Sequence, residues 1–200
     1  DGVCVHLGGG FHHAFPDHGA GFCLINDIAV SIQKALSSRM INRAAVIDCD
    51  LHQGDGTAHI FKDDPSVTTF SIHQQRTFPH FKQQSTIDLE LEDGAEDEQY
   101  LSLLSGGLDE IAKHGPFDLV HYQAGADPYV KDTLGGLALT IEGLHKRDRM
   151  VVDWAANEGV PIVITLGGGY PESITEIGKI HANTALAAIE AAARLNRHNA

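Results

Sequence analysis

Short runs of apolar and β-branched residues alternate with longer stretches of helical periodicity along this chain of 200 residues. Such alternation is typical of βαβ units and predicts an α/β fold, a mostly parallel sheet that helices flank on both faces. The expected strands are Val3–Leu7, Ala44–Cys49, Val67–Ile72, Leu119–Gln123 and Val160–Leu166. The expected helices are Leu24–Leu36, Asp97–Ala112, Thr140–Asn157 and Glu172–Leu195.

Length and composition limit the class of protein. The length fits one domain, and 42% hydrophobic with 20% charged residues is typical of a folded globular chain. No apolar run reaches the roughly 18 residues of a membrane helix, so we expect no membrane partner. Cys4, Cys23 and Cys49 are too few for a disulfide framework, which favours a reducing cytoplasm.

The charge balance narrows the partners. The 14 Lys+Arg and 27 Asp+Glu residues give a net charge of −13, which repels phosphate backbones and disfavours nucleic acid. A cationic substrate is compatible with this charge. The chain also carries 13 histidines, the commonest metal ligand and the usual acid–base residue at neutral pH.

Glycines and metal-ligand or acid–base residue types follow four of the five expected strands. These segments are Gly8–His13 (GGGFHH), Asp48–Gly56 (DCDLHQGDG), Ala124–Asp127 (AGAD) and Gly167–Tyr170 (GGGY). Ligands of open parallel sheets bind at the carboxyl ends of the strands, so we expect the segments to converge on one pocket. The glycine runs lack the dinucleotide fingerprint, and no P-loop lysine follows them.

The segment that begins at Asp48 has the pattern of a metal site. Strand alternation places Asp48, Asp50 and His52 on one side and the two intervening residues on the other. Zn²⁺ takes carboxylate and imidazole ligands, and a catalytic zinc keeps one position open for water. Asp50 and His52 supply two ligands, and Asp127 is the natural third. The alternative is that the carboxylates cap a following helix.

The remaining polar residues fit acid–base chemistry. A water activated by a metal needs a general base, and a leaving amine needs a general acid, roles that His12 and His13 fit. Catalytic imidazoles are usually oriented by carboxylates, and Asp48 and Asp55 remain for this task. The alternative is an ordinary pair of core or surface histidines.

Two further segments have a functional and a plain interpretation. The glycines before Tyr170 allow the backbone to approach a site closely, and the tyrosine hydroxyl could then donate to an oxyanion. The alternative there is a tight turn with a surface tyrosine. The loop 74–86 is long enough for a functional loop, although a plain surface loop is equally compatible.

Six collinear motifs resemble the zinc-dependent histone deacetylase family, which has the arginase/deacetylase fold and includes bacterial acetylpolyamine and acetoin-utilisation proteins. The motifs are Gly8–Ala14 (GGGFHHA), Gly21–Asp27 (GFCLIND), Asp48–Gly56, Gly125–Asp127, Gly135–Gly143 (GGLALTIEG) and Gly167–Tyr170. The Phe78-Pro79 loop and the Ser85–Asp88 segment after it are most similar to the class IV branch and its bacterial relatives.

The resemblance implies a role for each residue that matches a family motif. The family's zinc ligands are matched by Asp50, His52 and Asp127. Its catalytic residues are matched by His12 with its partner Asp48, His13 with its partner Asp55, and Tyr170. Among them, His13 matches the main acid–base residue and Tyr170 the tyrosine that polarises the substrate carbonyl.

The resemblance also implies a substrate channel and a second cation. Walls of the acyl-lysine channel are matched by Phe22, Phe78 and Leu134. The family binds a monovalent cation such as K⁺ near Asp48, through backbone oxygens and a serine that are matched by Asp50, His52 and Ser71.

The function implied is that of a zinc-dependent amidohydrolase, which removes an acetyl or longer acyl group from an amine such as lysine Nε or a polyamine. Two alternatives stay open: a binuclear manganese ureohydrolase of the same architecture, and a non-catalytic or weakly active metal-binding module.

The family's catalytic domains also carry a segment before the His-His motif that this chain, which begins at Asp1, does not contain. We therefore expect a fragment or processed chain, in which residues 1–200 form roughly the C-terminal two-thirds of one catalytic domain. Self-association through the uncovered sheet edge near Val3–Leu7 is expected.

Overall fold

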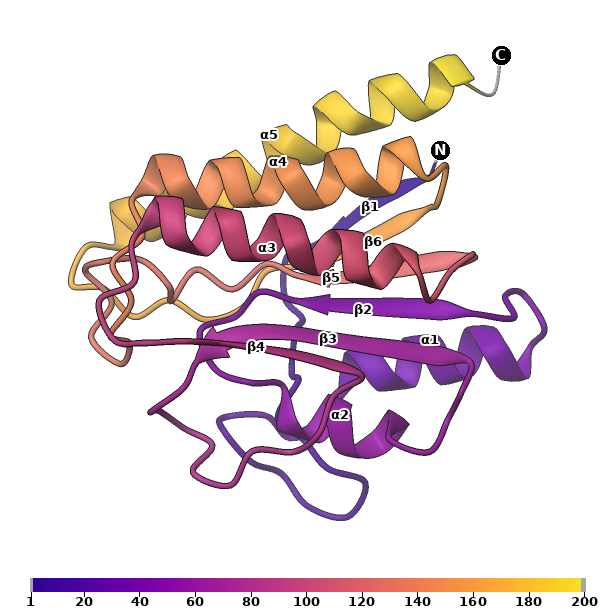
Figure 1. Cartoon of the computed structure of the whole chain (residues 1–200), viewed down its shortest axis with the longest axis horizontal. Coiled ribbons are helices and arrows are strands. Elements are labelled where there is room, and N and C mark those ends of the chain that lie inside the picture. The colour runs from indigo at the N-terminus through magenta and orange to yellow at the C-terminus, as the bar shows by residue number, and fades with distance from the viewer. Residues whose placement is uncertain (1, 199–200) are drawn as a thin grey trace.

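The computed structural model describes residues 2–198, which fold around one six-stranded sheet (Figure 1). The strands follow the order β1-β6-β5-β2-β3-β4, and every neighbouring pair is parallel. Their bounds are β1 (Val3–His6), β2 (Ala44–Asp48), β3 (Val67–Gln74), β4 (Ile87–Leu91), β5 (Leu119–Gln123) and β6 (Ile162–Thr165). The predicted mostly parallel α/β sheet is confirmed.

Helices cover both faces of the sheet, as predicted. Figure 1 shows α3 (Asp97–Ala112), α4 (Ile141–Asn157) and α5 (Ile174–His198) on one side and α1 (Asp27–Ser37) and α2 (Asp55–Phe61) on the other. The larger core lies between the sheet and α3, α4 and α5, and the smaller one lies under α1. None of the helices within residues 2–198 is long and apolar enough to cross a membrane.

The structure contains two elements that the sequence did not predict, and several predicted elements have different bounds. Strand β4 lies at the edge of the sheet with polar residues between its apolar ones, and α2 has only seven residues. Helix α1 begins at Asp27 rather than Leu24, because the side chain of Asn26 accepts the backbone N–H of Ala29 and caps the helix there.

The central strands β2 and β5 carry the residues of interest. Every residue of β2 is buried, and its last residue, Asp48, is in register with Gln123, the last residue of β5. Strands β2 and β5 therefore end at the same level and on the same edge of the sheet. The loops that follow these two strands are brought together by the strand order alone.

Candidate active site

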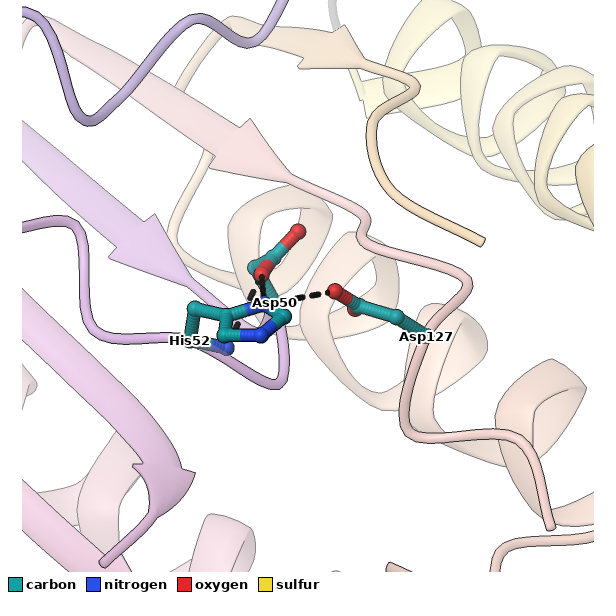
Figure 2. A group of neighbouring side chains, drawn as sticks. All are labelled: Asp50, His52 and Asp127. Carbon is teal, nitrogen blue, oxygen red and sulfur yellow. Dashed lines mark hydrogen bonds and ion pairs between the residues drawn. The ribbon is translucent and has the colours of Figure 1, made fainter. Parts of the chain in front are cut away.

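Three metal-ligating side chains meet where β2 and β5 end. Figure 2 shows Asp50, His52 and Asp127 pointing toward one another from the loops after these strands. One ligand atom from each lies within 4.8 Å of the others. The Nδ1 atom of His52 is 2.9 Å from Asp127 Oδ2 and 3.2 Å from Asp50 Oδ1. Two carboxylates and an imidazole make a donor set suited to a divalent metal such as zinc.

The local backbone explains this arrangement. Cys49 and Leu51 are buried in the core, so the intervening Asp50 turns its side chain the other way. The N-cap residue of α2 is Gly54, which forms no side-chain cap, so neither Asp48 nor Asp50 caps this helix. A Cβ atom at Gly125 would lie 2.5 Å from Asp50 Cα, which makes glycine necessary at this close approach.

The charges of the group fit a cation. Burial and then the charge of Asp50 raise the pKa of Asp127, because two carboxylates this deep in the protein repel each other. Burial alone would lower the pKa of His52, but its hydrogen bonds to Asp127 and Asp50 raise it to about 10. A proton on His52 therefore balances the carboxylates here. A divalent cation held by the same three residues would balance them more fully.

The two adjacent histidines each have a carboxylate partner. The Nδ1 of His12 donates to Asp48 Oδ2 at 2.6 Å, and that of His13 donates to Asp55 Oδ1 at 2.7 Å. All four side chains are buried. The Nδ1 bond leaves Nε2 as the ring nitrogen of His13 that can accept a proton. The ring of His13 lies 6.0 Å from that of His52, between centroids.

Tyr170 stands at the rim of the same cavity. Its backbone N–H donates to Asp132 Oδ2 at 2.6 Å, and its carbonyl accepts from Thr133 Oγ1 at 2.6 Å, so both sides of the residue are fixed. Burial, followed by the charge of Asp127, raises the pKa of the Tyr170 phenol. The phenol therefore stays protonated at neutral pH and can donate a hydrogen bond.

One cavity of about 750 Å³ is lined by the three metal-ligating residues, both adjacent histidines and Tyr170, but not by Asp48 or Asp55. The residues predicted as channel walls, Phe22, Phe78 and Leu134, also line it. The Phe78 ring meets the His13 ring edge-on at 4.9 Å, and the Phe22 ring lies 6.0 Å from the Tyr170 ring. The loop 74–86 is therefore part of the cavity wall rather than a detached surface loop.

The residues predicted to bind a monovalent cation lie at the end of β2, in the loop after it and in β3. Ser71 is buried and in register with Asp48, and its Oγ lies 2.9 Å from His73 Nδ1. Asp48 Oδ1 accepts the backbone N–H of Asp50 at 3.1 Å. The grouping places Ser71 beside the metal segment, and K⁺ binding there stays a prediction.

Several residues that sequence reasoning missed hold the site in shape. The carboxylate of Asp27 accepts the backbone N–H of Gly10 and Phe11, and Gln123 Nε2 donates to the Gly10 carbonyl at 3.2 Å. Gln53 donates to the Gln83 carbonyl at 2.7 Å and so ties the loop 74–86 to the metal segment. Asp27 and Gln53 lie inside the motifs GFCLIND and DCDLHQGDG. These positions were the sequence signal that could have identified the two residues.

Comparison with known proteins agrees with this geometry. A protein of Picosynechococcus sp., described as uncharacterized, is 43% identical over 176 residues, 88% of this chain and 59% of that protein. Histone deacetylase 2 of Arabidopsis thaliana is 32% identical, over 88% of this chain and 46% of its own length. The acetoin utilization protein AcuC of Staphylococcus aureus is 34% identical, over 82% of this chain and 45% of its own length.

A solved structure and a family model also match this chain. The crystal structure of acetylpolyamine aminohydrolase from Burkholderia pseudomallei matches with a TM-score of 0.75 and 26% identity, over 88% of this chain and 53% of that one. The chain thus spans about half the length of the curated relatives it matches. Residues 1–186 match the histone deacetylase domain, and the chain belongs to this family.

Proposed function

We propose that this protein is a zinc-dependent amidohydrolase that removes an acyl group from a primary amine. The observation that carries the proposal is the convergence, in one cavity, of the Asp50–His52–Asp127 group with His13 and Tyr170. Family membership and the likeness to an acetylpolyamine aminohydrolase support deacylation of an amine as the reaction class. Three free cysteines support a reducing cytoplasm as its location.

Asp50, His52 and Asp127 would hold the metal. When bound, a divalent cation there supplies Lewis acidity, which polarises the amide carbonyl and lowers the pKa of water. The open side of the group faces the cavity, where the walls Phe22 and Phe78 leave room for an extended acyl-amine. The net charge of −13 suits a cationic substrate.

His13 then carries out the proton transfers, and Tyr170 donates a hydrogen bond. His13 accepts the proton of the attacking water at Nε2 while Asp55 holds the ring through Nδ1. The water oxygen bonds to the carbonyl carbon, and the Tyr170 hydroxyl donates to the developing oxyanion. His13 returns its proton to the amine nitrogen as the C–N bond breaks. The products are a carboxylate and a free amine.

The single metal group favours this function over a binuclear manganese ureohydrolase. Among the side chains that the structure describes, those of residues 2–193, Asp50, His52 and Asp127 are the one group of three or more His, Cys, Asp or Glu residues placed to hold a metal. The buried partners of His12 and His13, and the donor Tyr170, favour catalysis over a module that only binds.

An acyl-substrate panel with metal analysis tests the proposal. The protein is loaded with Zn²⁺ or Mn²⁺ and offered acetyl-lysine peptides, acetylpolyamines, longer acyl-lysines and arginine-like guanidines. We expect one zinc per chain and release of free amine from at least one acyl-amine. Two metals per chain with urea release would support the ureohydrolase, and binding of acyl-amines without turnover would support the binding module.

A further inference from the structure

A buried arginine lies beneath the candidate metal group. Arg147 of α4 has no exposed surface, and it is the bulkiest of the fully buried side chains described for residues 2–193. Removing a guanidinium from water is costly unless its hydrogen bonds are replaced. An apolar side chain at this position would avoid this cost. The hydrogen bonds of Arg147 therefore point to a specific role for its guanidinium.

Its contacts lead to the two loops that carry the metal-ligating side chains. Arg147 Nη1 donates to the carbonyl of Cys49 at 3.2 Å and to the carbonyl of Gly125 at 2.5 Å. Cys49 directly precedes Asp50, and Gly125 lies two residues before Asp127. One nitrogen of the guanidinium thus bridges the segments after β2 and β5 at the points where they hold the ligand side chains.

Those carbonyls lie beyond the last residues of their strands. Strands β2 and β5 end at Asp48 and Gln123, and the Cys49 N–H still donates to the Gln123 carbonyl at 3.0 Å. Beyond that point the described residues form no further backbone–backbone hydrogen bond between the two segments, although these stay close at Gly125 and Asp50 and the Leu51 N–H donates to Asp127 Oδ1 at 2.9 Å. A planar side chain donating to both carbonyls therefore fixes their separation where strand pairing no longer does.

The charge of Arg147 is balanced locally. Its Nε and Nη2 donate to Asp148 Oδ1 at 3.0 and 2.8 Å. Asp148 is buried too, and it accepts from Tyr122 and Thr184, each at 2.6 Å. A cation paired in this way adds little repulsion toward a second cation nearby. Arg147 can thus serve the metal group by geometry without opposing it by charge.

We propose that Arg147 is a positioning residue that sets the separation of the Asp50 and Asp127 segments and so the affinity and geometry of the metal site. The inference rests on the proposed metal site. Arg147 touches neither the cavity nor the ligand side chains, so it acts through the two carbonyls. Loss of a partner that orients ligands typically costs about 10–100-fold in metal affinity.

Three variants separate positioning from packing. Arg147→Met keeps the bulk and removes both carbonyl contacts, whereas Arg147→Lys keeps the charge for Asp148 and removes the planar fork. Thr184→Val is the matched control, because it removes a buried donor to the same Asp148 and leaves both carbonyls untouched. Each is examined for Zn²⁺ affinity by chelator competition, for the visible spectrum of bound Co²⁺ and for thermal unfolding without metal.

We expect Arg147→Met to bind Zn²⁺ at least about 10-fold more weakly, with a changed Co²⁺ spectrum. Arg147→Lys should show the same changes to a smaller degree and fold if Arg147→Met does not. Thr184→Val should unfold at a lower temperature and keep the wild-type affinity and spectrum. Unchanged affinity and spectrum in the folded arginine variants would overturn the inference. A wild-type protein that binds no metal would instead refute the proposed function.

Discussion

The rings of His12 and His13 lie 4.0 Å apart between centroids, yet their pKa values move in opposite directions. Burial alone would lower the pKa of His12, but the carboxylates of Asp48 and Asp50 raise it to about 9. The pKa of His13 falls below 6.5, because burial and the charge of His12 outweigh Asp55. Without a bound metal, His12 is therefore charged at neutral pH and His13 is neutral, as a general base must be.

Replacing His13 by alanine should remove most of the turnover. A general acid–base group typically contributes about 10²–10⁴-fold, and we expect a loss of this size in kcat. Metal content should be unchanged, because the group of Asp50, His52 and Asp127 does not include His13. The exposed His18 supplies a control variant, His18→Ala, which should retain activity. Turnover of His13→Ala within about threefold of wild type would remove this residue from the mechanism.

The activity should have an acid limb below pH 6.5. His13 accepts a proton only when it is neutral, so activity falls as the pH drops through its pKa, which burial and the His12 charge hold below the usual 6.5. A divalent cation nearby lowers that pKa further, so its effect has the same sign. A profile of kcat/KM over roughly pH 4–9 measures the limb. A limb above pH 6.5 would contradict the assignment of His13 as the base.

The local elements were predictable where their patterns are long. Helix α3 has the predicted bounds, and α4 starts one residue after Thr140, which caps it through the N–H of Gly143; the periodicity of both helices runs over several turns. Strand alternation predicted which side of the segment Asp50 would face. Helix α2 has only seven residues, and Asp88 and Glu90 interrupt the apolar run of β4, so neither pattern was distinguished from a loop.

The supporting contacts of the site could not be predicted in this way. Arg147 reaches a carbonyl 98 positions away, and Gln123 reaches one 113 positions away. Such pairs depend on how the strands are ordered in the sheet, which periodicity does not determine. Asp132 likewise holds Tyr170 across 38 positions, and no local motif marks it.

Metal binding should depend on Asp127. Asp127→Ala leaves Asp50 and His52 as the remaining ligands of the group, and we expect an affinity loss beyond the about 10–100-fold typical of outer partners. Elemental analysis after dialysis and chelator competition measure the loss. The matched control is Asp109→Ala, which removes an exposed carboxylate from α3. Wild-type stoichiometry and affinity in Asp127→Ala would show that the ligand assignment is wrong.

Tyr170→Phe should lower kcat while leaving metal binding intact. The phenol is expected to donate to the oxyanion that forms during the reaction, and loss of one such donor typically costs about 10²–10³-fold in kcat. The ring remains, so its contact with Phe22 and the value of KM should change little. Steady-state kinetics separate the two constants. A variant with raised KM and unchanged kcat would indicate that Tyr170 only binds substrate.

The 200-residue chain expressed alone should self-associate through β1. Within residues 2–198, this strand pairs only with β6, so its outer edge presents backbone groups without a strand partner. Leu7, directly after the strand, is 76% exposed and adds apolar surface beside that edge. Leu7→Lys should weaken the association, because a charge next to an open edge disfavours pairing. Lys179→Ala on α5 is the control and should associate as the wild type does. Light scattering measures the mass, and a stable monomer of 21.5 kDa for the wild-type chain would contradict this prediction.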